Sequence, residues 1–230
     1  MSGLRERKKV RTRHALIEAA LRLFTEKGYE QTTLAEIAAE ADISPRTFFS
    51  YFDSKEDVLF FDAEARLRRA QAVLAGRRPG EPVADLLSRM VSDSMEFTIE
   101  DNDLHLSLDT QRTRLVLAAP ALQARAMQVM LDSQTQLAWT LHEVFAGELS
   151  PEQAAAAVGA VVGAIKVAAM MVLLKGEPNA RIEDAVKIGT TVALEGVRRL
   201  TPPRDSGDGR TGPESRRPRP CAPMPPPPAV

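Results

Sequence analysis

Apolar residues recur at helical spacing through most of the first 200 positions. In 9–27, for example, Leu16, Ala20 and Phe24 lie on one face of a helix. The chain has no convincing run of alternating polar and β-branched residues of the kind that forms a half-buried strand. We therefore predict an all-α protein of about nine helices, at 9–27, 33–41, 44–52, 54–74, 83–101, 103–117, 120–146, 151–175 and 181–200.

Capping residues mark several of these helix ends. Thr33 and Glu36 stand at the spacing of a capping box, and Ser44 precedes a proline at the first helical position. Gly28 supplies a stop for the first helix, and Ser150 precedes another N-terminal proline. These signals predict two short helices within 33–52, joined by a turn at 41–43.

The segment 33–52 has the features of two helices that cross closely. Ala38 is small enough for a close contact, Asp42 is among the few residues that tolerate a left-handed turn, and Phe48 faces back toward the first helix. This is the logic of a helix-turn-helix, whose second helix enters the DNA major groove. The spacing alone fits an ordinary helical pair equally well.

Polar residues around the second helix favour the DNA-binding interpretation. Arg46 lies one turn into the helix, where it can reach the edge of a guanine. Ser44, Thr47 and Tyr51 can contact phosphates, and Lys55 adds a positive charge at the start of the next helix.

Charge and cysteine content limit the functional classes to which the protein can belong. Thirty Lys and Arg against 31 Asp and Glu leave a net charge of −1, so a nucleic-acid surface has to be local. The N-terminal segment 1–13 supplies such a surface, because it contains six lysines and arginines and only one acidic residue, Glu6. Without the adjacent helix pair, we would interpret this segment as a solvated terminus. The single cysteine, Cys221, excludes a disulfide framework and a cysteine-ligated metal site.

The chain shows no signature of catalysis. His14, His105 and His142 are far apart, and we find no glycine-rich phosphate loop, nucleophile elbow or zinc-protease motif. We therefore expect no enzyme activity, no metal and no cofactor. No apolar run follows the basic N-terminal residues, so the sequence predicts a cytoplasmic protein rather than a secreted one.

The segment from about Arg11 to Leu59 resembles the DNA-binding domain of TetR-type transcriptional regulators. The resemblance rests on Ala19-Ala20, Leu23-Phe24, Gly28-Tyr29, Thr32-Thr33, Ile37-Ala38, Ala41, Ile43-Ser44, Thr47-Phe48-Phe49, Tyr51-Phe52 and Ser54-Lys55-Glu56. Two positions depart from the family pattern. The turn has Asp42 where glycine is usual, and the second helix has Phe49 where tyrosine is usual, so one hydroxyl donor is missing.

The resemblance implies a homodimeric repressor that binds a pseudo-palindromic double-stranded DNA operator and is released by a small apolar or amphipathic effector. An activator of the same family, or a helical binding module without DNA affinity, is the alternative. The DNA-facing residues carried over from the family are Thr33, Ser44, Pro45, Arg46, Thr47, Phe49, Tyr51 and Lys55.

We expect four regions: a basic arm at 1–8, a DNA-binding domain at 9–69, a helical ligand-binding and dimerisation domain at 70–200, and a tail at 201–230. Ten of the 16 prolines lie in the tail, which lacks apolar periodicity and is therefore predicted to be disordered. The tail is either a docking motif for a proline-binding partner or dispensable.

The almost wholly apolar segment 154–174 has three interpretations: a transmembrane helix, a buried central helix, or a helix shared between its own domain and a second subunit. Lys166 near its middle opposes the first. The family resemblance favours the third and implies no membrane partner. The residues expected at the dimer interface are Gly159, Gly163, Val192 and Val197.

The effector pocket is expected among the helices of the second domain. The candidates are adaptable methionines, rings and polar residues: Met90, Met95, Phe97, His105, Met127, Met130, Trp139, Lys166 and Met170. Methionines at helical spacing fit an ordinary core equally well. Lys166 either holds an anionic ligand or pairs with Asp132 or Glu143, and the paired state is favoured.

Overall fold

The computed structural model describes residues 3–100, 103–177 and 180–200. These residues form α-helices and one 3₁₀ helix, and they contain no strand, which confirms the all-α prediction. The elements are α1 (Leu4–Lys27), α2 (Leu34–Glu40), α3 (Pro45–Phe48), the 3₁₀ helix η1 (Asp57–Phe60), α4 (Ala63–Ala75), α5 (Val83–Glu100), α6 (Asp103–Ala118), α7 (Pro120–Val144), α8 (Pro151–Leu174) and α9 (Ala180–Val197).

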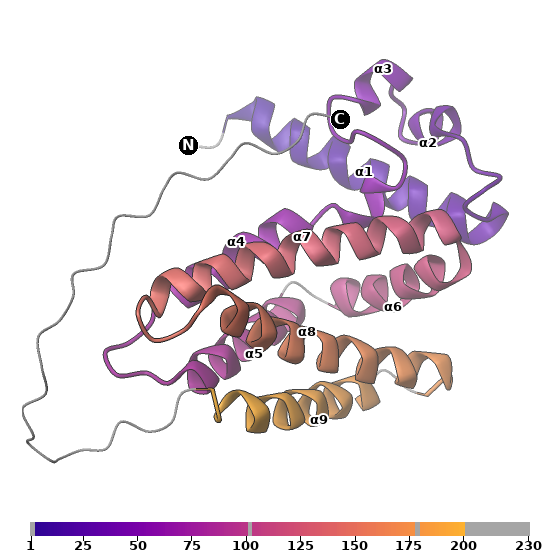
Figure 1. Cartoon of the computed structure of the whole chain (residues 1–230). Helices are drawn as coiled ribbons and strands as arrows, with labels where there is room; N and C mark the ends of the chain where they lie inside the picture. The colour runs from indigo at the N-terminus through magenta and orange to yellow at the C-terminus, as the bar shows by residue number, and fades with distance from the viewer. Residues whose placement is uncertain (1–2, 101–102, 178–179, 201–230) are drawn as a thin grey trace, which may run out of the picture.

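The helices are stacked from one end of the molecule to the other. Figure 1 shows α1, α2 and α3 together at one end, a layer containing α4 and α7 next to them, and α8 with α9 at the opposite end. The longest helices run side by side, with α8 packed between α7 and α9. This stacking leaves α2 and α3 at an outer edge of the molecule.

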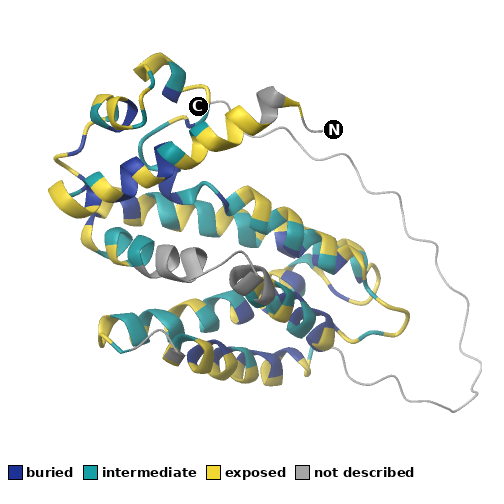
Figure 2. Ribbon diagram, turned by 180° about the vertical axis from the view of Figure 1, so that it is seen from behind, coloured by how far each residue is buried: buried dark blue, intermediate teal, exposed yellow. Residues whose placement is uncertain are grey.

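One hydrophobic core lies under the first three helices. Leu16, Phe24, Ile37 and Phe48 are fully buried in it. The dark blue positions of α1 in Figure 2 show how this helix turns its apolar face toward α2 and α3. Leu122 of α7 belongs to the same core, so the second domain contributes directly to the packing of the first.

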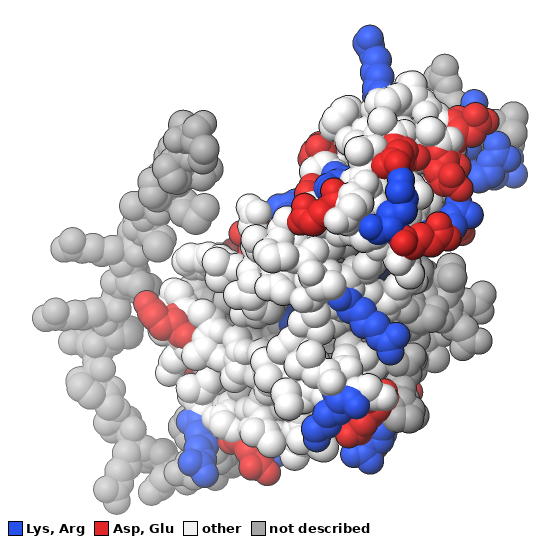
Figure 3. All heavy atoms as spheres, turned by 90° about the vertical axis from the view of Figure 1, so that its right-hand side faces the viewer, with Lys and Arg blue, Asp and Glu red and all other residues white. Residues whose placement is uncertain are grey.

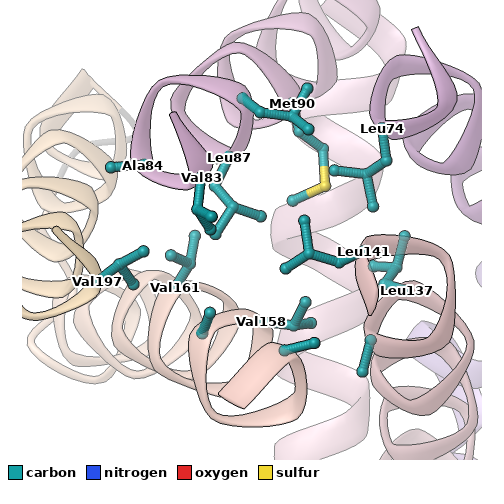
Figure 4. Packing of buried hydrophobic residues seen from close by; sticks show 14 of the residues in the cluster. Leu74, Val83, Ala84, Leu87, Met90, Leu137, Leu141, Val158, Val161 and Val197 are labelled. Atoms are coloured by element: carbon teal, nitrogen blue, oxygen red, sulfur yellow. The ribbon is translucent and has the colours of Figure 1, made fainter. Parts of the chain in front are cut away.

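A second core joins α4, α5, α7, α8 and α9. In Figure 4, Leu74, Leu87, Leu141 and Val161 converge from four of these helices. Met90 is 4% exposed and packs in the same cluster, so it is a core residue rather than an open pocket wall. The side chains contributed by each helix follow its 3.6-residue period, as the sequence pattern predicted.

Two predicted boundaries are wrong near the N-terminus. The first helix begins at Leu4 rather than at position 9, so the segment predicted as an arm continues α1. The helix predicted over 54–74 is instead η1 followed by α4, with a break at Phe61 and Asp62. Val58 and Leu59, which lie in η1 before the break, are buried in the first core.

The later boundaries agree closely with the sequence prediction. The observed helices α5 to α9 lie within a few residues of the predicted ranges. Ser150 caps α8 through a capping box with Gln153, and the side chain of Ser150 accepts a hydrogen bond from the Gln153 amide. Local capping chemistry therefore sets the start of the longest apolar helix.

Helix α8 is buried on one side only. Ala157, Val158 and Val161 face the second core, whereas Val167, Met171 and Leu174 are exposed. Among the described residues, α8 is long and apolar enough to span a membrane, yet it packs along both α7 and α9. The uncovered apolar face fits the third interpretation of this segment better than the second.

Close packing of α8 on α9 depends on a glycine that the sequence pattern did not single out. A Cβ atom at Gly189 would lie 2.8 Å from the carbonyl oxygen of Ala164, whereas a Cβ at Gly163 would meet nothing within 4 Å. A Cβ at Gly159 would lie 3.9 Å from Oε1 of Gln134, an ordinary contact. Among the glycines of α8 and α9, Gly189 therefore lies nearest to the neighbouring helix.

Candidate nucleic-acid interface

The start of α2 is fixed by the predicted capping box. The Thr33 hydroxyl accepts from the Glu36 amide at 3.2 Å, and the Thr33 amide donates to the Glu36 carboxylate at 2.8 Å. Lys27 forms an ion pair with the same carboxylate. This lysine, together with Thr33, lowers the pKa of Glu36 to about 2, so the carboxylate remains ionised near neutral pH. Glu36 thus anchors α2 to the end of α1.

The turn between α2 and α3 has the geometry that its sequence implies. Asp42 has a φ of 55°, and it is the only non-glycine residue with positive φ in the described segments. The Ile43 amide donates to the carbonyl of Ala38 at 2.9 Å, and Ala38 is fully buried. The predicted close crossing at Ala38 is therefore confirmed.

The second helix of the pair is short but held at both ends. Ser44 caps it by accepting from the Thr47 amide at 3.1 Å, and Phe48 anchors it in the first core. Regular α-helix ends at Phe48, earlier than predicted, but the Phe52 amide still bonds to the Phe48 carbonyl at 3.1 Å. Helical turns therefore continue through the whole segment 45–52.

The outward side of this segment carries most of the predicted DNA-facing residues. Ser44, Pro45 and Arg46 are exposed, and Phe49 is 57% exposed. Thr47 and Tyr51 are half-buried, and Thr33 is exposed at the start of α2. Figure 2 shows this exposed surface at the outer end of the molecule. An exposed phenyl ring beside polar groups suits contact with a thymine methyl or a sugar.

Lys55 has a structural task that the sequence did not reveal. Its Nζ donates to the carbonyls of Tyr29 at 3.0 Å and of Thr32 at 3.1 Å, and lies 4.0 Å from the centre of the Tyr29 ring. The lysine therefore stabilises the loop between α1 and α2. The predicted contact between Lys55 and a DNA phosphate stays a prediction. The phosphate would have to bind an ammonium group that already donates to two carbonyls.

Tyr29 also helps to stabilise the loop between α1 and α2. Its hydroxyl donates a hydrogen bond to the Glu56 carboxylate, and its ring packs against Phe24 at 5.3 Å between centroids. Burial, together with the neighbouring carboxylate of Glu56, raises the pKa of Tyr29 well above its usual range, so the hydroxyl stays protonated. Tyr29 is thereby locked beneath Lys55.

Basic residues line the exposed side of α1. Arg7, Lys8, Lys9 and Arg11 are exposed on its first turns. Arg13 is partly committed, because its Nη2 donates to the Phe61 carbonyl at 2.7 Å. In the view of Figure 3, charged side chains gather on the upper part of the molecule, where the first three helices lie.

The predicted effector-pocket residues differ in how far they are exposed. Met127 is 60% exposed on α7, and Lys166 is exposed on α8 rather than buried in an apolar helix. Met95, Met130 and Met170 are half-buried, and the side chains of Phe97 and His105 lie outside the described residues. The predicted pocket residues thus range from buried Met90 to exposed Met127, and the pocket itself stays a prediction.

One hollow adjoins the predicted set. It measures about 330 Å³, lies between α7 and the start of α8, and is lined by Leu131, Gln134, Thr135, Ala138, Trp139, Pro151, Glu152 and Ala155. Of the residues predicted for the pocket, this lining includes Trp139 alone. The Trp139 ring makes an edge-on contact with His142, with ring centres 6.0 Å apart.

The residues predicted for the dimer interface also differ in their exposure. Val192 is 65% exposed, close to exposed Ile188, whereas Val197 is 2% exposed and belongs to the second core. The placement of Val197 at a subunit interface is therefore wrong. Its position in the last turn of α9 turns it toward the same subunit instead.

Polar contacts that the sequence did not disclose join the two domains. Nη1 of Arg112 in α6 donates to buried Asp62 at 3.1 Å, and Asp62 also pairs with Arg66. Arg125 of α7 donates to Asp57 at 2.8 Å. These partners are 50 and 68 residues apart, so no local pattern signals them.

A sequence profile described as "Bacterial regulatory proteins, tetR family" matches residues 16–60. That range contains the capping box, the strained turn and the exposed segment of α3 described above. Residues 16–60 therefore form a tetR-type DNA-binding domain. The TetR-type resemblance expected from the sequence is thereby confirmed, and with it the helix-turn-helix domain of a transcriptional regulator.

Relatives of known name are transcriptional regulators. The chain is 34% identical to the HTH-type transcriptional regulator TcmR of Streptomyces glaucescens over 142 residues, which is 59% of this chain and 61% of TcmR. It is 48% identical over 48 residues to HbdR of Aromatoleum sp. (strain CIB), covering 21% of each. The matches thus span about three fifths and one fifth of these relatives' lengths.

Solved structures share the overall fold. FadR of Bacillus halodurans, described as a fatty acid degradation regulator, superposes with a TM-score of 0.53 at 22% identity, covering 81% of this chain and 96% of FadR. A putative TetR-family regulator from Mesorhizobium loti gives 0.52 at 16% identity with the same coverage. At such identities the likeness concerns the TetR-type fold alone.

Proposed function

We propose that this TetR-family chain is a homodimeric, sequence-specific DNA-binding repressor in the cytoplasm. The observation that carries the proposal is the segment 44–51, whose polar and aromatic side chains face outward while Phe48 fixes it to the core. Such a segment can insert its outer side into a major groove, where Arg46 reads base edges and the hydroxyls of Ser44 and Thr47 meet phosphates.

Two copies are required for a specific site. The exposed apolar residues of α8 and α9 offer a face for a second subunit, with Val167, Met171, Ile188 and Val192 at its centre. A two-fold dimer places its reading segments about one helical turn of DNA apart, or roughly 34–36 Å. The operator is then pseudo-palindromic.

Release by an effector uses the contacts between the domains. A small apolar or amphipathic molecule that binds the helical domain more tightly in one arrangement of α6 and α7 shifts the protein toward that arrangement. The Arg112–Asp62 and Arg125–Asp57 pairs then carry the displacement to α4 and η1, and so to the spacing of the two reading segments. We expect no catalytic activity and no metal or cofactor in this cycle.

The test is a mobility shift of the full chain on the DNA upstream of its own gene, followed by footprinting. We expect protection of two half-sites about one turn apart, and reduced transcription from the neighbouring promoter in a reconstituted assay. Increased transcription from a footprinted site would identify an activator instead. Absence of any shift at low salt, where phosphate contacts are strongest, would overturn the DNA-binding proposal.

A further inference from the structure

The hollow between α7 and α8 has the shape and the apolar lining of a docking groove. Trp139, the chain's one tryptophan, lies along its wall and is 47% exposed, a large fraction for an apolar ring. Leu131 is also exposed there. Pro151 and Ala155 from the start of α8 form the opposite side. A shallow apolar trough with an exposed indole ring is the kind of surface on which proline-rich segments pack.

The stretch of chain that lines this groove carries acidic side chains and no basic ones. Positions 126–165 contain no lysine or arginine, but they contain Asp132, Glu143, Glu148 and Glu152. Glu148 pairs with Arg77, whereas Asp132 and Glu143 are exposed on α7 and stand seven residues before and four residues after Trp139. That spacing places both carboxylates on the Trp139 side of the helix. Glu152, in the groove lining, is held as a carboxylate because the hydrogen bond from the Ser150 hydroxyl lowers its pKa.

The same chain carries a segment of matching chemistry. After Ser215 the tail contains Arg216, Arg217 and Arg219, no acidic residue, and seven prolines. A polyproline II helix has three residues per turn. In that conformation Arg217, Pro220, Pro223 and Pro226 share one edge of the tail, so that a cation is followed by three proline rings.

The tail also starts at the correct end of the molecule. Figure 1 shows the last turn of α9 at the same end as the last turn of α7 and the first turn of α8. The groove includes this first turn of α8 and extends along residues 131–139 of α7. Arg217 lies seventeen residues beyond Leu200. At about 3.1 Å per residue in an extended proline-rich conformation they span roughly 50 Å, more than the ~37 Å length of a 25-residue helix such as α7.

We propose that the C-terminal tail of this chain docks on the groove between α7 and α8, with the prolines at 220, 223 and 226 packed on Trp139 and Arg217 beside the carboxylate of Glu152. The tail is thereby a ligand of its own helical domain. The proposal is independent of DNA binding and of the effector.

The unique tryptophan makes the test direct. In the full chain, Trp139 is expected to emit at shorter wavelength and to have a smaller acrylamide quenching constant than in a chain that ends at Leu200. A synthetic peptide of residues 213–228, added to the shortened chain, should restore both values in a saturable manner. High salt should weaken the peptide's binding, because part of the attraction is between charges at the surface.

Matched variants separate this groove from a general effect of the tail. In the full chain, Pro220→Ala combined with Pro223→Ala should expose Trp139, whereas Pro202→Ala combined with Pro203→Ala should leave its fluorescence unchanged. Glu152→Lys should weaken docking, and Arg217→Glu in the same chain should restore it.

Three results would overturn the proposal. The first is identical Trp139 fluorescence in the full and shortened chains. The second is protection that persists in the shortened chain and grows with protein concentration, which would mean that a second copy covers the groove. The third is an equal effect of the two proline pairs, which would leave no role for the spacing of Pro220 and Pro223.

Discussion

Single residues show most clearly how the reading segment could discriminate between sequences. Arg46 is exposed in the first turn of α3, and the backbone beneath it is fixed by the Ser44 cap and by buried Phe48. Arg46→Ala is expected to weaken operator binding by about 1–3 kcal/mol and to relax the preference at one base pair of each half-site. Fluorescence anisotropy on the operator and its single-base variants measures both effects.

The control for this substitution is Arg68→Ala, which removes the same charge from an exposed pair with Glu64 on α4, away from α3. It should leave the base preference intact. An equal loss on every DNA sequence for Arg46→Ala would assign this arginine to a phosphate rather than to a base.

Asp42 stores backbone strain at the turn. Its φ of 55° lies in the left-handed region. This region is unfavourable for residues with a Cβ atom but not for glycine. Asp42→Gly should therefore stabilise the folded state by up to ~1 kcal/mol, despite the greater entropy of glycine in the unfolded chain. Urea denaturation measures the change. Asp53→Gly, at an exposed loop position without positive φ, should be neutral or destabilising; if both variants behave alike, strain at Asp42 is not the cause.

What the sequence reveals about a residue depends on how near its partners are. The Thr33–Glu36 and Ser44–Thr47 caps join residues three positions apart, so their pattern is visible in the sequence and was predicted correctly. Lys55 binds carbonyls 23 and 26 residues away, and such a contact leaves no local pattern. Its role as a support of the loop between α1 and α2 is therefore visible only in three dimensions.

At the scale of elements, apolar spacing determined where the helices lie but not how they pack. The ranges of α5 to α9 followed from periodicity, and α7 and α8 each begin at a proline. The break between η1 and α4 did not, because it depends on the burial of Val58 and Leu59 and on the pairing of Asp62 with Arg112. Similarly, Gly159 and Gly163 attracted attention by their spacing, whereas Gly189 makes the close contact.

Gly189→Ala is predicted to force α8 and α9 apart. The added methyl would lie 2.8 Å from a backbone oxygen of α8, which cannot rotate away as a side chain could. We expect a loss of about 1–3 kcal/mol in the free energy of unfolding, as in other overpacked cores. Gly196→Ala, in the same helix but with no neighbour within 4 Å, should be neutral or should stabilise by up to ~1 kcal/mol. Thermal denaturation of both variants is decisive, and equal stability would refute the packing argument.

At the scale of the whole molecule, the proposed dimer depends on the apolar face of α8 and α9. Val192→Glu introduces a charge at a residue that is 65% exposed in one subunit and buried in the proposed dimer. We expect the variant to be a folded monomer by light scattering and to lose operator affinity. Met127→Glu makes the same kind of change at an exposed position of α7 and should remain dimeric. A Val192→Glu protein that stays dimeric would place the interface elsewhere.

The two domains are also less separate than a division at position 69 suggests, because Leu122 of α7 completes the core beneath α1, α2 and α3. Leu122→Ala should leave a cavity there and destabilise the protein by about 2–5 kcal/mol. Met127→Ala, on the exposed side of the same helix, should change stability by less than about 0.5 kcal/mol. Hydrogen exchange should locate the loosened amides of the Leu122 variant in α1 and α2, although the substitution lies in α7. If the loosened amides were confined to α7, the helical domain would not support the DNA-binding domain through this side chain, and effector signals would have to pass through the Arg112–Asp62 and Arg125–Asp57 pairs alone.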